Sequence, residues 1–293
     1  MKKVLDAYIN LNHTFISFLK VLFTSKFRRK IPKATSSEIF IIGTGPSLKP
    51  VLENHLDILT HHDLMAVNFF YKTEHFAQLK PKFYITAAPE LWEDASNDHY
   101  KNLGDDFFNA IEKNVSWDMV FIMPYSARKF ERWKRILKNK HIHLFYYNTT
   151  AVEGLKSSTR FLTRKGLGIP RAHNVLAHGL LNAWWMGYQK AYLLGADHTF
   201  FDGLKVNEKS EFVARNEHFY DKKKDDFRQI AITDRYTKKL HDHVFKLYLT
   251  FKGYWDILEI TQKSDFKVYN LTKESMIDAF EKRDIESEFK QKA

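Results

Sequence analysis

Short apolar runs alternate with helix-length segments from Glu38 onward. The runs predict buried strands over Ile39–Ile42, Leu64–Val67, Phe83–Thr86, Met119–Met123, His143–Tyr147, Ala191–Leu194 and Phe266–Tyr269. Helical spacing of apolar side chains predicts helices over Ser47–Leu59, Asp105–Lys113, Ser126–Lys138, Asn174–Met186, Thr233–Thr261 and Ser275–Lys282. Because strands that alternate with helices form βαβ units, we predict an α/β fold. It would be a single Rossmann-like, doubly wound domain over residues 35–293, with a mostly parallel sheet and a C-terminal helical extension.

Residues 1–34 follow a different pattern. Apolar side chains recur at helical spacing, apart from Asn12, at Leu5, Tyr8, Ile9, Phe15, Ile16, Leu19, Leu22 and Phe23. Polar residues interrupt this stripe too often for a spanning helix or a secretory signal. An amphipathic helix must bury its stripe, either on an anionic membrane surface or on its own domain. The first alternative predicts a peripheral protein at the cytoplasmic, inner face of a membrane, bound through residues 1–30.

The distribution of charge favours a membrane partner over a nucleic acid. Residues 1–34 hold eight Lys or Arg and one acidic residue, a net +7 of the chain's +11, which leaves +4 for the remainder. A nucleic-acid binder usually carries a basic stripe across its folded body, so we expect no nucleic-acid partner. The chain contains no cysteine, which excludes disulfides, thiolate zinc sites and a cysteine nucleophile.

The turn Gly43-Thr44-Gly45-Pro46-Ser47 follows the first predicted strand and opens a helix. Its glycines allow close backbone approach to a ligand, and free N–H groups at a helix start favour a phosphate. Ser47 could cap the helix or donate to a phosphate oxygen. The turn is neither a dinucleotide fingerprint nor a Walker loop, so a ligand-free tight turn remains the alternative.

Further polar residues follow later strands. Asn68 ends the second strand, and Asp197 and His198 stand together after another, where they could bind ribose or act as a base. The alternative is that Asp197 caps a turn and His198 lies on the surface. Arg171 and Asn174 precede a helix whose N-terminus would point into the same crevice.

The segment 200–230 is either a lid or disordered, and it contains His218 and Tyr220. His241-Asp242-His243 has no second pair of ligands at metal spacing, so we interpret it as a solvated helix face. We therefore predict no metal site.

Three segments resemble known families as a set: Ile41–Leu48, Val67–Tyr71 and Gly187–His198. Together they are similar to the bacterial sialyltransferases of glycosyltransferase family 42, and more so to the related "6-hydroxymethylpterin diphosphokinase MptE-like" proteins, a domain of unknown function. The similarity covers residues 38–282. It implies a Rossmann-like glycosyltransferase that uses a CMP-activated acidic sugar in surface polysaccharide biosynthesis, without a required cofactor, on a glycan or lipid-linked acceptor.

The resemblance also implies roles for particular residues. Donor contacts would fall on Asn68, Thr44, Thr199 and Tyr220, and the catalytic base would be His218, with Asp197 or His198 in reserve. Thr44 replaces a family Asn, a second family Asn is missing near Ala88-Pro89, and Thr199 stands where a Tyr is expected. Backbone N–H groups from Gly45 to Ser47, with Arg171, would hold the departing phosphate.

Two other functions remain open. The family label suggests diphosphate transfer from ATP to a hydroxymethylpterin, which requires Mg²⁺ held by carboxylates. Asp197 is the only well-placed acid for that reaction. The third possibility is a non-catalytic partner that binds nucleotide or glycan.

Overall fold

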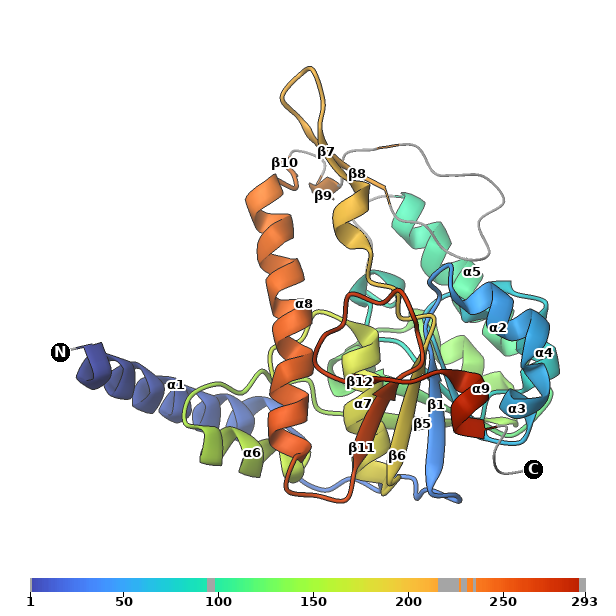
Figure 1. Ribbon diagram of the computed structural model, residues 1–293, viewed down its shortest axis with the longest axis horizontal. Coiled ribbons are helices and arrows are strands. Elements are labelled where there is room, and N and C mark those ends of the chain that lie inside the picture. Colours follow the sequence, from blue (N-terminus) through green and yellow to red (C-terminus); the bar gives the residue numbers. More distant parts are fainter. Residues whose placement is uncertain (1, 94–97, 216–226, 228–230, 234–235, 290–293) are drawn as a thin grey trace.

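The computed structural model describes residues 2–93, 98–215, 227, 231–233 and 236–289. Its centre is a parallel eight-stranded sheet with the order β12-β11-β6-β1-β2-β3-β4-β5 (Figure 1). The strands are β1 (Glu38–Ile42), β2 (Asp63–Val67), β3 (Phe83–Ile85), β4 (Met119–Pro124), β5 (Ile142–Tyr147), β6 (Lys190–Leu194), β11 (Lys267–Asn270) and β12 (Glu281–Lys282). The order reverses between β1 and β6, where β6 pairs in parallel with β1 on the side away from β2.

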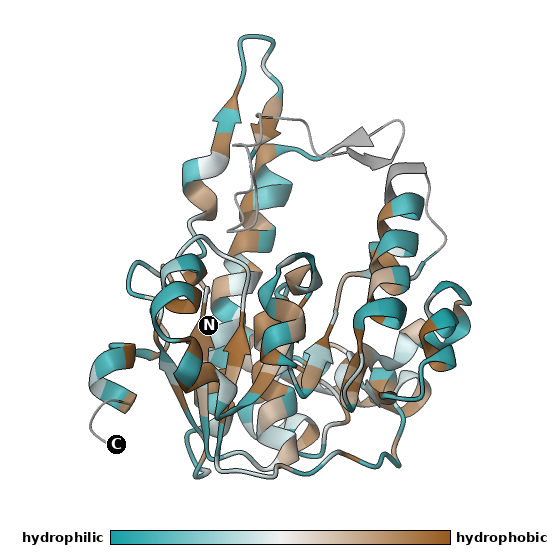
Figure 2. Ribbon diagram, turned by 90° about the vertical axis from the view of Figure 1, so that its right-hand side faces the viewer, coloured by the Kyte–Doolittle hydropathy of each residue, from teal (hydrophilic) through white to brown (hydrophobic). Residues whose placement is uncertain are grey.

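Alternating side chains of each strand point to opposite faces of the sheet, and each face has its own hydrophobic core. Because both faces are buried, the sequence of each strand is a continuous apolar run. In β1, Phe40 and Ile42 join one core, whereas Ile39 and Ile41 join the other. Figure 2 shows the strands as mostly hydrophobic ribbons, while the helices carry both colours. Both faces of the sheet are therefore covered, as the predicted doubly wound class requires.

The first core lies under α2 (Leu48–Asn54), α3 (Leu56–Thr60), α4 (His75–Leu79), α5 (Asp98–Asn114) and α9 (Ile285–Phe289). The second lies under α7 (Val175–Met186) and α8 (Leu240–Thr261). α6 (Lys156–Arg164) packs on α8 at the side. Short 3-10 helices connect these elements: η1 (Phe70–Lys72), η2 (Pro89–Leu91), η3 (Tyr125–Lys129), η4 (Arg132–Lys138) and η5 (Phe200–Gly203).

After β6 the chain forms two pairs of short antiparallel strands above the sheet. β7 (Leu204–Val206) and β8 (Phe212–Ala214) make an antiparallel hairpin, and β9 (Ala231–Thr233) pairs with β10 (Tyr236–Thr237). Figure 1 shows this hairpin and the start of α8 standing above the body of the domain. Part of the predicted loop at 200–230 is thus ordered as a hairpin.

The N-terminal helix α1 (Lys2–Thr24) projects away from the rest of the chain (Figure 1). Its polar side faces the domain: the Ser17 hydroxyl donates to the Glu153 carbonyl at 2.9 Å, and Thr14 Oγ1 accepts from the Leu155 N–H at 2.8 Å. Its apolar side chains other than Val21 face outward, and Phe23 is 80% exposed. In the described chain, the domain does not cover the stripe. No helix there has the length and hydrophobicity needed to cross a membrane.

The helix predicted over Ser275–Lys282 is wrong. Ser275 donates from its hydroxyl to the Ala196 carbonyl at 2.6 Å, and the Met276 N–H donates to the Asp197 carbonyl at 2.9 Å. These bonds hold the segment across the loop after β6, and β12 follows. α8 also begins at Leu240, later than predicted, because Ala231–Thr233 pairs as a strand.

The helix predicted over Ser126–Lys138 forms as two 3-10 helices. The Ala127 carbonyl accepts from the Phe130 N–H at 3.1 Å, the 3-10 pattern, and from the Trp133 indole N–H at 2.7 Å. The indole thus takes the place that an α-helical N–H would use.

Candidate functional site

The loops after β1 and β6 meet at the point where the strand order reverses. The Gly43 N–H donates to the Leu194 carbonyl at 2.8 Å, and the Gly45 N–H donates to the Gly195 carbonyl at 2.9 Å. A Cβ on Gly43 would lie 2.4 Å from the Gly195 oxygen, so only glycine fits. In doubly wound sheets this reversal is where ligands bind.

Asp197 joins the two loops through its side chain. Its Oδ1 accepts from the Ser47 N–H at 3.0 Å, and its Oδ2 accepts from the Ser47 hydroxyl at 2.8 Å. The carboxylate is buried, at 8% exposed. A phosphate bound by the N–H groups of Gly45 and Ser47 would therefore compete with bonds inside the protein.

Asn68 combines a strained backbone with an unpartnered polar side chain, two features that are common at ligand-binding positions. Its φ is 45°, in the left-handed region, and its side-chain Oδ1 is buried without a hydrogen-bond partner. The Tyr84 hydroxyl donates to its backbone carbonyl and fixes the turn. An unpartnered buried amide oxygen at the edge of a cavity is satisfied when a ligand donates to it.

His198 is buried in a polar cluster with Asn174 and Tyr254. Its Nε2 lies 3.1 Å from Asn174 Nδ2 and 2.8 Å from the Tyr254 hydroxyl. Asn174 caps α7, because its Oδ1 accepts from the Leu176 N–H at 2.7 Å. Since an amide nitrogen only donates, Nε2 of His198 accepts. Burial lowers the pKa of His198 to about 3, so its imidazole is neutral at physiological pH.

Two adjoining cavities open beside these residues. The smaller, of about 190 Å³, is lined by Gly43, Thr44, Gly45, Pro46, Val67, Asn68, Asn174, Val175, Leu176, Gly195, Asp197, His198, Thr199, Phe200 and Arg215. The larger, of about 680 Å³, shares Asn68, Asn174, Val175 and Phe200 with it. We call them the switch-point cavity and the side cavity.

Most of the residues that the sequence singled out come together in the switch-point cavity. Gly43, Thr44, Gly45, Pro46, Asn68, Asn174, Asp197, His198 and Thr199 line it, and Ser47 bonds to its wall. His218 and Tyr220 lie outside the described residues.

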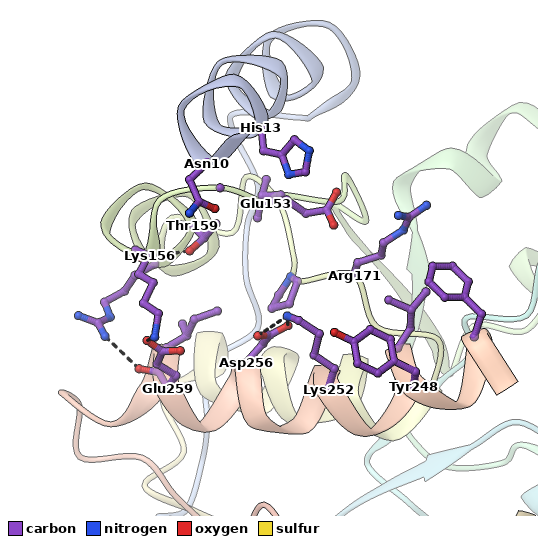
Figure 3. A pocket seen from close by; sticks show the side chains of 17 residues that line it. Asn10, His13, Glu153, Lys156, Thr159, Arg171, Tyr248, Lys252, Asp256 and Glu259 are labelled. Carbon is purple, nitrogen blue, oxygen red and sulfur yellow. Dashed lines mark hydrogen bonds and ion pairs between the residues drawn. The ribbon is translucent and has the colours of Figure 1, made fainter. Parts of the chain in front are cut away.

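Arg171 lines a different pocket, of about 370 Å³, between α1, α6 and α8 (Figure 3). There Lys252 pairs with Asp256 at 2.6 Å and Lys156 pairs with Glu259 at 2.7 Å. Arg171 therefore lies apart from the switch-point cavity, although the chain from Ala172 to Asn174 lines the side cavity.

Sequence reasoning missed several basic residues of the cavities. Arg215 follows β8 and lines the switch-point cavity, and it stands three positions before His218, which the sequence did single out. Lys238, Lys246, His173 and His243 line the side cavity. The prediction of a solvated face for His241-Asp242-His243 is wrong for His243, whose Nδ1 lies 2.7 Å from the Lys238 ammonium.

Metal ligands are not grouped in the described ranges. There, no set of three or more His, Asp or Glu side chains is placed to hold one metal ion.

No known protein family and no curated protein matches the sequence. Among solved structures, the chain is similar to the MAf glycosyltransferase from Magnetospirillum magneticum AMB-1, with a TM-score of 0.50 and 14% identity. The match covers 94% of this chain and 39% of that one, so this chain spans well under half the length of that protein. At this identity the likeness concerns the fold, and it agrees with the predicted α/β class. The resemblance to MptE-like proteins and family 42 sialyltransferases stays a prediction.

Proposed function

We propose that the chain is a glycosyltransferase that moves an acidic sugar from a CMP-activated donor to a glycan or lipid-linked acceptor in surface polysaccharide biosynthesis. The observation that carries the proposal is the switch-point cavity, which is lined both by Asn68, with its unpartnered amide oxygen, and by the turn from Gly43 to Pro46. A nucleoside base or ribose offers donors to such an oxygen. The fold of the MAf glycosyltransferase is compatible with this proposal.

The reaction we propose is a direct displacement. The acceptor hydroxyl oxygen attacks the anomeric carbon, the bond from that carbon to the phosphate oxygen breaks, and CMP leaves with the electron pair. His218 takes the proton of the acceptor hydroxyl, because an imidazole with an ordinary pKa near 6.5 suits a base at neutral pH. His198 is less suited, since its Nε2 is already bonded and its pKa is lowered to about 3.

We assign Arg215, in place of Arg171, to the phosphate of the donor. Arg215 lies in the wall of the switch-point cavity, whereas Arg171 lies in the pocket beside α1. A guanidinium near the phosphate stabilises the charge that develops as CMP departs. Thr44 and Thr199 offer hydroxyl groups to the same ligand.

We also propose that α1 binds an anionic lipid surface. The helix offers its polar side to the domain and its apolar side outward, and exposed cations follow at Lys20, Lys26, Arg28, Lys30 and Lys33. Apolar side chains beside clustered cations match the boundary between acyl chains and anionic headgroups. Arg29 is excluded from this set because it packs over the Trp185 ring, with its carbon 5.4 Å from the ring centre.

The test is a thermal-shift titration of the full chain with CMP, CDP, UDP, GDP and ATP, each with and without Mg²⁺. A ligand at about 100 times its dissociation constant raises stability by roughly 2.7 kcal/mol, which is readily measured. We expect CMP to stabilise the protein without metal. Stabilisation only by ATP with Mg²⁺ would overturn the proposal in favour of diphosphate transfer, and a preference for UDP or GDP would change the donor.

A further inference from the structure

The side cavity carries an unusual concentration of basic side chains. His173 precedes α7, Lys238 lies two residues before α8, and His243 and Lys246 lie near the start of α8; all four line the cavity. Glu90 is the carboxylate that also lines it, from η2, and it is exposed.

Lys238 is the residue at the centre of this group. It is only 7% exposed, and its Nζ lies 2.7 Å from His243 Nδ1. Burial, and then repulsion from Lys246, lowers the pKa of Lys238 to about 8, and attraction from Asp242 offsets part of this shift. Burial, with Lys238 and Lys246, lowers the pKa of His243 to about 4. At neutral pH the Lys238 ammonium therefore donates to a neutral imidazole.

The cations lack a matching carboxylate among the described residues that line the cavity. Asp242, the nearest acid along α8, accepts from the Lys239 N–H at 3.1 Å and lies 3.4 Å from His241 Nε2. Glu90 is not among the charges that shift the pKa of His173, Lys238 or His243. Asp242 is the carboxylate that attracts Lys238, whereas Lys246 repels it. Burying an ammonium group beside a second cation is unfavourable, and an anionic ligand in the cavity would reduce that penalty.

We propose that Lys238 and Lys246, with His173, form a subsite for a carboxylate or phosphate group of the substrate. The subsite rests on the proposed function for its place, because Asn68 and Asn174 line both cavities. A nucleotide in the switch-point cavity would place its transferred sugar in the adjoining side cavity, near the basic group. The carboxylate of an acidic donor sugar and the phosphate of a lipid-linked acceptor share the required chemistry.

The test compares ligands that differ by one charge. The full chain is titrated by calorimetry with N-acetylneuraminic acid, with its neutral methyl ester, and with inorganic phosphate and a short-chain prenyl phosphate. The variants are Lys238→Met and Lys246→Met, and the control is Lys252→Met, the same change on the same helix outside the cavity. Thermal unfolding checks each variant, and Lys246, which is exposed, provides a readout should Lys238→Met fail to fold.

We expect the native chain to bind the acid at least about tenfold more tightly than the ester. Lys246→Met and Lys238→Met should bring that ratio close to one, whereas Lys252→Met should leave it unchanged. The ratio should also fall as the pH rises above about 8, where Lys238 loses its proton. If the variants weaken only the prenyl phosphate, the anion belongs to the acceptor.

The proposal is overturned if the acid-to-ester ratio and the affinity for both phosphates are the same in the native chain and in Lys246→Met. Titration with CMP separates this result from failure of the proposed function. An intact acid-to-ester ratio without CMP binding would keep the subsite and reject the donor.

Discussion

Asp197 accepts both available hydrogen bonds of Ser47, from its N–H at 3.0 Å and from its hydroxyl at 2.8 Å. This contact joins the loops after β6 and β1, the two strands between which the sheet order reverses. The buried carboxylate therefore stabilises the wall of the switch-point cavity.

We predict that Asp197→Ala lowers the free energy of unfolding by about 1.5–3 kcal/mol, because hydrogen bonds to a charged acceptor are lost. Ser47→Ala should lower it less, since the N–H bond remains. Urea unfolding of both variants and of the double variant gives the coupling energy. Asp202→Ala, a change of an exposed acid in the nearby η5, is the control and should have almost no effect. Additive losses would contradict the role of the contact.

Asn68→Gly should separate stability from ligand binding. Glycine adopts a φ of 45° without strain, so the variant should be as stable as the native chain or slightly more so. The unpartnered amide oxygen is lost, so CMP affinity should fall by about tenfold. Lys80→Gly is the matched control, because Lys80 has the same φ. Equal CMP affinity in both variants would remove Asn68 from the nucleotide site.

His218→Ala should lower turnover by about 10²–10⁴ if His218 is the general base. The measurement is release of CMP from the donor, with and without acceptor. The same change at His241, which is exposed on α8, is the control. Near-normal turnover would reject His218 as the base.

Membrane binding should depend on the outward side of α1. We expect the triple change Phe15→Ser, Leu19→Ser and Phe23→Ser to weaken sedimentation with anionic liposomes by at least about tenfold. Leu137→Ser, at an apolar residue of η4 that is 54% exposed, should not. High salt should weaken binding of the native chain, because screening acts on the exposed lysines. A lipid-free dimer that the triple change dissociates, with unchanged liposome binding, would assign the surface to a second copy.

Buried neutral histidines should make the protein sensitive to mild acid. His178 is buried and accepts at Nδ1 from the Tyr147 hydroxyl at 2.7 Å. Burial lowers its pKa from 6.5 to about 4. Between these values the unfolded chain binds a proton that the folded chain does not, so stability falls as the pH drops from 6.5 to 4. The loss is on the order of 3 kcal/mol for this group.

Urea unfolding at pH 7 and pH 5 tests this prediction, since most carboxylates stay ionised in that range. His178→Phe removes the titrating group and should reduce the difference between the two pH values. It should do so even though the Tyr147 hydroxyl loses its partner and overall stability falls. An unchanged difference would show that other groups cause the acid sensitivity.

The sheet could be predicted because its strands are buried on both faces. Ile39–Ile42 and Ala191–Leu194 are uninterrupted apolar runs, and the polar residues that follow them meet wherever parallel strands end together. For that reason the sequence could predict that Asp197 and Asn68, which each follow a strand, lie close together. Local patterns failed where distant contacts decide the conformation. Ser275 is held by the Ala196 carbonyl, 79 positions away, and no helical spacing reveals that bond.

The basic residues of the side cavity could not be predicted from the sequence, for a similar reason. Lys238 and His243 lie in a stretch rich in charge, where exposure is the usual expectation. Their burial follows from the direction in which α8 crosses the domain, a property of the assembled fold. The error for Arg171 is the opposite one: it was expected beside the phosphate, but it lines the pocket near α1, whereas the next residue, Ala172, lines the side cavity.

The attachment of α1 has a geometric consequence. Hydrogen bonds are directional, and a Cβ at Gly154 would lie 2.3 Å from Thr14 Oγ1, so helix and domain meet at close range in one orientation. Val21 packs with Val152 and Leu162 at the same junction. On a lipid surface, α1 would therefore fix the distance and the tilt of both cavities relative to the membrane. Only acceptor groups at that distance from the membrane could enter the cavities.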